Sequence, residues 1–330
     1  MKNLKRIFII FVLLFFFVSF NSSIESKPKT NNYITKKNKY NLKYNTLSAK
    51  QKLSIYYPKK IKKNRNNPVV LFLHGGYYQG GNKNTGLKKN RQYFNEAGYV
   101  YVTMNYRLMK QGSFPAAAND VKTAIRYLKY HSKKLAINPN KIIIIGHSAG
   151  ANLGALVSST PKIKSFDNEK IRYRKANNKV AGFIGIGGFY NLNSYFEINK
   201  ITKKEIVTID DNDNTTVTIK YIWPPFSKRQ ANLLPYYNLV NKQPDQKKFN
   251  KANPTKYISS LKARVYLIHG SKDTTVSYKQ MKEYCKLLKK NKKRVKCNIY
   301  KGKKHKYRYY TNKNSYNKMI KWMNKTVKHK

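Results

Sequence analysis

One serine in this chain stands where a serine can act as a nucleophile. Ser148 lies in the run Gly146-His147-Ser148-Ala149-Gly150, which follows four isoleucines and precedes a segment of small residues. A G-x-S-x-G pattern allows a sharp turn from a strand into a helix, which exposes the serine at the turn. We therefore predict that Ser148 is a catalytic nucleophile. The alternative is a buried strand followed by a chance pair of glycines.

A serine hydroxyl attacks well only when a base takes its proton, and the scarcity of acids narrows the choice of partners. The chain has 6 His and 13 Asp and Glu residues. His305 follows the last predicted strand, where a base can reach across the top of the sheet, whereas His269 closes a buried strand and is interpreted as a packed histidine. Among the acids after Ser148, Asp273 is the one just beyond the carboxyl end of a core strand. We predict that His305 is the base and that Asp273 orients it, in the chain order of one known type of triad.

A second glycine-containing segment could stabilise negative charge on a substrate. In "LHGGYYQGG", two glycines come directly after a buried strand, so main-chain N–H groups there can approach a carbonyl oxygen. We predict an oxyanion hole formed by Gly75, Gly76, Tyr77 and Ala149. A simple glycine turn is the alternative.

These residues need a scaffold in which strand ends meet at one edge. Continuous apolar runs predict buried parallel strands, and amphipathic segments predict helices between them. The expected strands are 68–76, 98–108, 141–146, 180–188, 264–270 and 295–300, and the expected helices are 86–97, 114–135, 149–156, 277–290 and 313–326. This alternation predicts an α/β fold with a mostly parallel central sheet and helices on both faces. Residues 51–58 are expected to form an edge strand ended by Pro58.

We expect one catalytic domain over residues 48–330, preceded by a basic irregular arm at 24–47. Residues 189–255 interrupt the alternation and are predicted to form a small cap over the carboxyl ends of the strands. Within the cap, "IVTIDDNDNTTVTI" predicts a hairpin with an acidic turn; a calcium loop is less favoured because the glycine and closing glutamate of an EF-hand are missing. Its aromatic residues could line a cleft or pack within the cap: Phe189, Tyr190, Tyr195 and residues 223–226.

The N-terminus and the charge bear on location and partners. Residues 1–23 have a basic start and an apolar run at 7–20, shorter than the roughly 20 residues of a spanning helix, which favours a signal peptide or an N-terminal anchor and hence export. The chain carries 69 Lys and Arg, and its net charge is +56. Such a charge favours contact with an anionic polymer or membrane surface, although a generally basic solvated surface is the simpler interpretation. No nucleic-acid-binding module accompanies the charge, so nucleic acid is not expected as a partner.

The chain has 2 cysteines, and both are expected to face inward. Cys285 belongs to an apolar helical stripe, and Cys297 alternates with Val295 and Ile299 on one strand face. We expect two buried free thiols rather than a bridge between helix and strand. Their spacing does not suggest a metal site.

Several of these motifs together resemble the α/β-hydrolase superfamily. They are "LHGGYYQGG", "MNYRL", "FPAAANDVKTAIRYL" with "INPNKIIIIGHSAGANLGAL", "YLIHGSKDTTVSYKQ" and "YKGKKHKY", and the resemblance covers roughly residues 48–328. Bacterial feruloyl-esterase-like and hormone-sensitive-lipase-like esterases are the most similar groups. "HGGYYQ" is also similar to the "HGGYW" loop of arylformamidases.

The resemblance implies a cofactor-free hydrolase of carboxylic esters with small acyl or aryl groups, without a metal. Tyr77 stands where these esterases often have a third glycine, which narrows the expected pocket. The alternatives are an arylformamidase-type amide hydrolase, then a prolyl-oligopeptidase-like peptidase, then a non-catalytic protein that binds polyanions.

Overall fold

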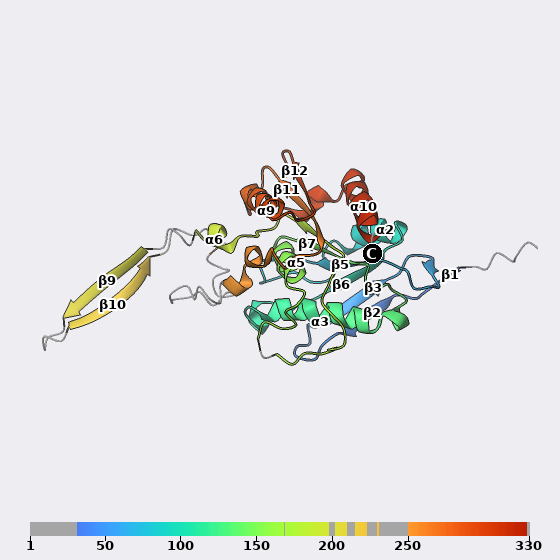
Figure 1. The fold of residues 1–330 in the computed structure, drawn as a ribbon, viewed down its shortest axis with the longest axis horizontal. Coiled ribbons are helices and arrows are strands. Elements are labelled where there is room, and N and C mark those ends of the chain that lie inside the picture. Colours follow the sequence, from blue (N-terminus) through green and yellow to red (C-terminus); the bar gives the residue numbers. More distant parts are fainter. Residues whose placement is uncertain are drawn as a thin grey trace, which may run out of the picture. The chain divides into compact units, whose positions relative to one another are not determined.

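A computed structural model describes residues 32–167, 169–197, 202–209, 215–222, 230 and 250–328. Its largest sheet has eight strands in the order β12-β11-β8-β7-β5-β6-β3-β2 (Figure 1). Their bounds are β2 Lys39–Lys43, β3 Lys52–Tyr56, β5 Val69–Leu73, β6 Val100–Met104, β7 Ile142–His147, β8 Gly182–Ile186, β11 Arg264–Gly270 and β12 Val295–Tyr300. The strands from β12 to β6 pair in parallel, and β3 and β2 continue the sheet antiparallel at one edge.

Helices connect the parallel strands. The α-helices are α2 Leu87–Glu96, α3 Ala116–Tyr130, α4 Ser132–Leu135, α5 Ala149–Ser159, α6 Leu192–Tyr195, α9 Tyr278–Lys290 and α10 Lys313–Lys328. Short 3-10 turns are η1 Met109–Gln111, η4 Pro254–Tyr257 and η5 Tyr307–Tyr310. Two separate strand pairs are β1 Tyr33–Ile34 with β4 Ile61–Lys62, and β9 Thr202–Ile209 with β10 Thr215–Ile222.

Helices cover both faces of the sheet, as the sequence predicts. Along β5, Leu71 belongs to the core under α3, α5 and α9, whereas its neighbour Phe72 belongs to the core under α2 and α10. Successive residues of a strand point to opposite faces, so a strand buried on both faces must be apolar throughout. This accounts for the uninterrupted apolar run that predicted β5.

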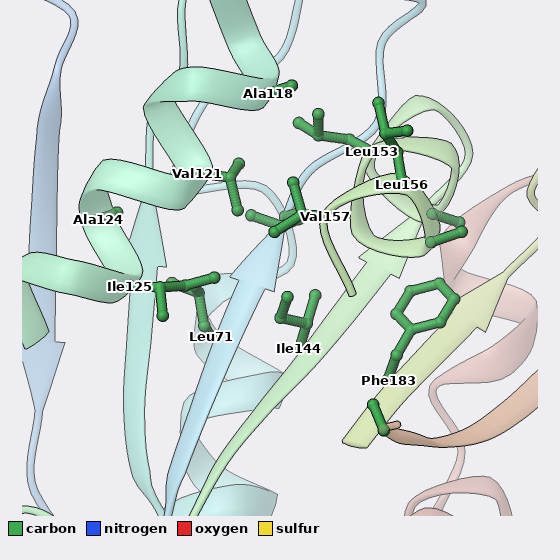
Figure 2. Close-up of a cluster of buried hydrophobic side chains, with 14 of the residues drawn as sticks. Leu71, Ala118, Val121, Ala124, Ile125, Ile144, Leu153, Leu156, Val157 and Phe183 are labelled. Atoms are coloured by element: carbon green, nitrogen blue, oxygen red, sulfur yellow. The ribbon is translucent and has the colours of Figure 1, made fainter. Parts of the chain in front are cut away.

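Figure 2 shows the core between α3, α5 and the sheet, where aliphatic side chains of both helices meet those of the strands. The labelled members are Leu71, Ala118, Val121, Ala124, Ile125, Ile144, Leu153, Leu156, Val157 and Phe183. The small residues of α5 let it approach the sheet closely: a Cβ at Gly154 would lie 2.6 Å from the ring of Phe183. Because α5 begins directly after Ser148, this close packing fixes the start of the helix against the strand ends.

Two cations of α3 hold the segment 160–178, which follows α5. Lys122 is fully buried, and its Nζ donates to the carbonyl oxygens of Thr160 and Ile163 at 2.7 and 2.8 Å. Arg126 is 2% exposed and donates to the carbonyl oxygens of Arg172 and Lys164 at 2.8 and 3.0 Å. Main-chain oxygens thus satisfy the donors of these two buried cations.

The expectation of an irregular arm over 24–47 is wrong at residues 39–43, because these residues form β2 and pair with β3. The strand at 51–58 is therefore not the edge of the sheet; β2 is. The sequence of β2, KYNLK, has a single aliphatic residue, and its side chains are exposed or half-buried. An edge strand held by main-chain hydrogen bonds shows little of the apolar pattern that marks the central strands.

The expectation of two free thiols is also wrong. Cys285 of α9 and Cys297 of β12 form a disulfide with a Cα–Cα distance of 6.6 Å. Cys285 is buried as expected, whereas Cys297 is half-buried against the same core. Because α9 packs directly on β12, the two inward faces meet, and the bridge between helix and strand is the arrangement found.

Much of the predicted cap lies outside the described residues, including the acidic turn at 210–214 and residues 223–226. The hairpin is present as the antiparallel pair β9 and β10. Phe189 and Tyr190 are fully buried, and the ring of Phe189 stacks on that of Tyr195 at 4.7 Å. These three aromatic residues therefore pack in the core instead of lining a cleft.

The N-terminal segment with the apolar run at 7–20 also lies outside the described residues. Within the described ranges, the structure has no helix that combines the length and the apolar character needed to cross a bilayer.

Candidate active site

Ser148 occupies a strained turn between β7 and α5. Its φ is 54° and its ψ is −119°, a conformation with positive φ that residues other than glycine rarely adopt. The flanking glycines make the turn fit: a Cβ at Gly146 would lie 2.2 Å from the carbonyl oxygen of Gly150, and one at Gly150 would lie 2.3 Å from that of Leu73. Close packing on both sides of the serine therefore requires glycine at both flanking positions of the G-x-S-x-G pattern.

The structure brings Ser148, His305 and Asp273 together in one hydrogen-bonded series. The Nε2 atom of His305 lies 2.9 Å from Ser148 Oγ, and its Nδ1 lies 2.7 Å from Asp273 Oδ2. A carboxylate only accepts hydrogen bonds, so Nδ1 carries the proton and Nε2 is left to accept from the serine hydroxyl. His305 comes from the loop after β12 and Asp273 from the loop after β11, so adjacent parallel strands deliver both to one edge of the sheet.

Asp273 is 6% exposed and is surrounded by donors. The N–H groups of Thr275 and Val276 both donate to Oδ1 at 2.9 Å. On the other oxygen, His305 is joined by His269, whose Nε2 lies 3.1 Å away. Burial by itself would raise the pKa of Asp273, but the hydrogen bonds from His269 and His305 outweigh it and hold the pKa well below its usual value. Asp273 is therefore charged, and its orientation is determined by four donors.

Two histidines, the buried His269 and the half-buried His147, contribute contacts that the sequence did not reveal. His269 is packed as expected, but it also reaches Asp273, and its position four residues earlier, at a strand end, was the available signal. His147 donates from Nε2 to the main-chain carbonyl of His305 at 3.0 Å, and its ring lies 5.2 Å from that of Tyr307. Burial, followed by the nearby His305, lowers the pKa of His147 to about 3, so this ring is a neutral donor that holds the His305 loop.

The segment predicted to form the oxyanion hole lies beside the nucleophile. A Cβ at Gly75 would lie 3.0 Å from the Cβ of Ser148, so the chain passes as closely as a glycine allows. Gly76 has a φ of 120° and Tyr77 a φ of 53°, in a turn closed by a hydrogen bond from the N–H of Gly80 to the carbonyl of Gly76 at 2.9 Å. Ala149 is the first residue of α5, so its N–H has no acceptor within the helix. The four predicted residues thus come from the two turns that flank Ser148 in space.

Tyrosine side chains fix this turn. The Tyr78 hydroxyl donates to Asn152 Oδ1 of α5 at 2.7 Å, and the Tyr106 hydroxyl donates to the carbonyl oxygen of His74 at 2.7 Å. The His74 ring stacks on that of Tyr106 with 4.3 Å between centroids. Burial lowers the pKa of His74 to about 4, so it stays neutral at pH 7. The turn is therefore anchored to α5 on one side and to the segment after β6 on the other.

Taken together, these groups can perform nucleophilic attack on a carbonyl carbon. Ser148 supplies the nucleophile, His305 can take its proton, Asp273 can stabilise the resulting imidazolium, and main-chain N–H groups lie near the serine. Within the residues that the structure describes, no group of three or more His, Cys, Asp or Glu side chains is arranged to hold a metal ion.

A family model named BD-FAE matches residues 53–288 of the chain. Esterase LipI of Mycobacterium tuberculosis is 31% identical over 104 residues, which cover 32% of this chain and 32% of that protein. A probable isoprenylcysteine alpha-carbonyl methylesterase of Oryza sativa is 22% identical over 259 residues, covering 78% of this chain and 55% of that protein. The matches thus span between about a third and about half of the length of these curated relatives.

Solved structures share the fold at low sequence identity. A truncated carbohydrate esterase from gut microbiota superposes with a TM-score of 0.69 at 18% identity, covering 91% of this chain and 99% of that one. The propionate-bound esterase Est2 of Thermogutta terrifontis superposes with a TM-score of 0.62 at 18% identity, covering 92% and 96%.

The BD-FAE match covers more than half of the chain and includes the turn before Tyr77, the Ser148 turn and Asp273, while His305 follows it. The eight-stranded sheet and the structural neighbours are those of an α/β-hydrolase. The chain therefore belongs to the BD-FAE family and has the α/β-hydrolase fold.

Proposed function

We propose that this protein is a serine hydrolase that cleaves carboxylic esters of small acyl or aryl groups through an acyl-enzyme intermediate. The observation that carries the proposal is the series Ser148, His305 and Asp273, with contacts of 2.9 and 2.7 Å, at a strained turn next to a glycine-containing loop. A serine with a positive φ beside an oriented histidine is costly to maintain without a chemical role.

In the proposed reaction, Ser148 Oγ attacks the ester carbonyl carbon while His305 Nε2 takes its proton. Asp273 keeps Nδ1 protonated and stabilises the imidazolium that forms. The N–H groups of Ala149 and of the turn at Gly76 and Tyr77 stabilise the tetrahedral oxyanion. His305 then gives its proton to the leaving alkoxide, and a water molecule, activated in the same way, releases the acid from the acyl-serine.

The choice of ester over amide, and of a small acyl group, is supported by the relatives. The neighbours include a carbohydrate esterase and an esterase described with propionate and with butyrate bound. Tyr77 replaces a third glycine in the turn, which favours a narrow pocket.

The test is hydrolysis of p-nitrophenyl acetate, butyrate and octanoate, beside N-formyl-kynurenine, by the purified protein. The variants are Ser148→Ala and, as a matched control, Ser259→Ala at an exposed serine. We expect turnover of acetate and butyrate esters that is lost in Ser148→Ala and kept in Ser259→Ala. Faster turnover of N-formyl-kynurenine would replace the ester by a formamide substrate, and equal rates in both variants would refute the assignment of the nucleophile.

We propose, second, that the basic surface binds an anionic polysaccharide. A groove of about 850 Å³ beside α2 is lined by Lys59, Lys60, Lys88 and Arg91, with Glu96 as its acidic member. None of these four cations has a carboxylate partner within the described residues. Several cations without a carboxylate partner along the described part of one groove attract a polyanion, and release of its counterions makes the binding depend on salt.

The test compares retention on immobilised polygalacturonate for the wild type and for a variant that combines Lys59→Glu, Lys60→Glu and Lys88→Glu. The control places three Glu residues at Lys282, Lys286 and Lys289 of α9, which changes the net charge equally. We expect the groove variant to elute at lower salt than the control. Equal elution would show that net charge alone governs retention, and preference for anionic vesicles or DNA would reassign the partner.

We also propose that the N-terminal segment directs export. The basic start and the apolar run at 7–20 support it, as does the disulfide, since disulfides persist in oxidising compartments. Fractionation of the producing cell, with mass analysis of the N-terminus, tests this proposal; recovery of the protein in the cytosol would refute it.

A further inference from the structure

His269 lies at the penultimate position of β11, and its side chain is completely buried. Its Nε2 atom lies 2.9 Å from the carbonyl oxygen of Val276 and 3.1 Å from Asp273 Oδ2. Both oxygens only accept hydrogen bonds, so Nε2 carries a proton that is shared between them. The Nδ1 atom is buried and has no hydrogen-bond partner within the described part of the chain. The ring is therefore held entirely through Nε2.

The two acceptors of His269 both belong to the loop between β11 and α9, which carries Asp273. Donation to Val276 holds the far end of this loop, and donation to Asp273 Oδ2 holds the carboxylate itself. His305 uses the same carboxylate oxygen through Nδ1, at 2.7 Å. His269 comes from the central sheet, not from the loop, so it ties the position of the carboxylate to β11.

Two donors on one oxygen also compete for its charge. Each hydrogen bond spreads the negative charge of Asp273, so the second donor weakens the attraction of the carboxylate for a proton on His305. The other titratable groups that face this cluster are His147, against His305, and Tyr310, near Asp273. His269 differs from both because it hydrogen-bonds the carboxylate directly.

We propose that His269 is a positioning residue of the active centre, which orients Asp273 toward His305 and shares the carboxylate oxygen that His305 uses. This inference rests on the proposed function, because it assigns His269 a part in the same triad. It extends the triad to a fourth side chain that touches neither the substrate nor the nucleophile.

Substitution of His269 by glutamine or by asparagine distinguishes this role from simple packing. A glutamine side chain places its amide nitrogen about as far from the backbone as Nε2 of histidine, whereas asparagine ends at the distance of Nδ1. We therefore expect His269→Gln to keep the contact with Asp273 and His269→Asn to lose it. In His269→Asn, kcat should fall about tenfold to a hundredfold, as for the loss of one hydrogen bond to a charged group.

The same loss removes one of the two donors on Asp273 Oδ2, so more of the carboxylate charge is left to the Nδ1–H group of His305. We expect the acid limb of the kcat/KM profile of His269→Asn to move to higher pH by about half a unit or more, while His269→Gln stays near the wild type. Ile268→Val is the matched control, since it removes one buried methyl group from the next residue of the same strand. It should lower stability without moving the acid limb.

The experiment records pH profiles of p-nitrophenyl butyrate hydrolysis for the four proteins, together with the NMR signal of the His305 Nδ1 proton, which reports its hydrogen bond to Asp273. A shifted acid limb and a shifted Nδ1-proton signal in His269→Asn, both restored in His269→Gln, support the proposal. An unshifted limb and an unshifted signal in both variants, with rate losses that match Ile268→Val, would overturn it. If the wild type hydrolyses no ester, the proposed function fails, and the Nδ1-proton signals still decide the role of His269.

Discussion

Replacement of Asp273 by asparagine should abolish most of the activity while leaving the shape of the site intact. The amide oxygen can take the place of Oδ1, which accepts from the N–H groups of Thr275 and Val276. The amide NH₂ group then stands where Oδ2 accepts from His305 and His269. It is itself a donor, so it would face the N–H groups of both histidines without an acceptor between them. His305 can avoid this clash by moving its proton from Nδ1 to Nε2, but Nε2 is the atom that has to accept the proton of Ser148.

The expected loss follows from that tautomer. A histidine protonated at Nε2 cannot accept the proton of Ser148, and removal of the equivalent carboxylate in a serine triad costs about 10⁴ in kcat. This corresponds to ~5.5 kcal/mol in the free energy of activation. The change in substrate binding should be small, because Asp273 contacts the base and is buried behind it.

The assay is kcat and KM for p-nitrophenyl butyrate at pH 7.5, with Asp167→Asn as the control. Asp167 is an exposed acid that accepts from Asn119 at 2.9 Å, so the control loses one charge without touching the triad. A fall in kcat of less than tenfold in Asp273→Asn, or an equal fall in the control, would refute the assigned role of Asp273.

Three further changes test the elements that hold the site. Gly150→Ala places a Cβ 2.3 Å from a main-chain oxygen at the end of β5; we expect a loss of about 3 kcal/mol in stability and of about a hundredfold in kcat, and wild-type values for both would contradict the packing argument. Burial lowers the pKa of His74 to about 4, so the unfolded chain binds this proton first as the pH falls. In urea titrations His74 should lower stability by up to about 1.4 kcal/mol per pH unit between about pH 6.5 and pH 4, beside an effect of the same sign from His147, whose pKa is about 3. His74→Gln should reduce the slope by the share of His74, and an unchanged slope would exclude His74 as one of its sources. Replacing Cys285 and Cys297 by serine opens a loop with a sequence separation of 12; calorimetry should show a decrease of about 5 °C in Tm, for a loss of about 3 kcal/mol, and no decrease would mean that the bridge does not constrain the unfolded chain.

The features that the sequence predicted best are those formed within one short segment of the chain. The glycines around Ser148 and the apolar run of β7 belong to one stretch of chain, so the turn that they form is a local property. The sequence predicted that His305 and Asp273 lie near each other because both follow strands that pair in parallel, which places their loops at one edge.

What could not be predicted depends on partners far apart in the chain. Strand β2 is held by main-chain bonds to β3, and its side chains carry little of the pattern. The bridge between Cys285 and Cys297 required knowing that their two inward faces meet. His147 donates a hydrogen bond to the main-chain carbonyl of His305, 158 positions later, and the sequence around His147 does not predict that contact.

The way in which α3 holds the segment 160–178 has a consequence for how this segment can change. Lys122 and Arg126 bind mostly carbonyl oxygens of its main chain, which every residue type supplies. Substitutions in this segment therefore leave these anchoring contacts in place, whereas an insertion or a deletion would move the oxygens away from the buried cations. Among related chains, we expect this stretch to keep its length while its residues diverge.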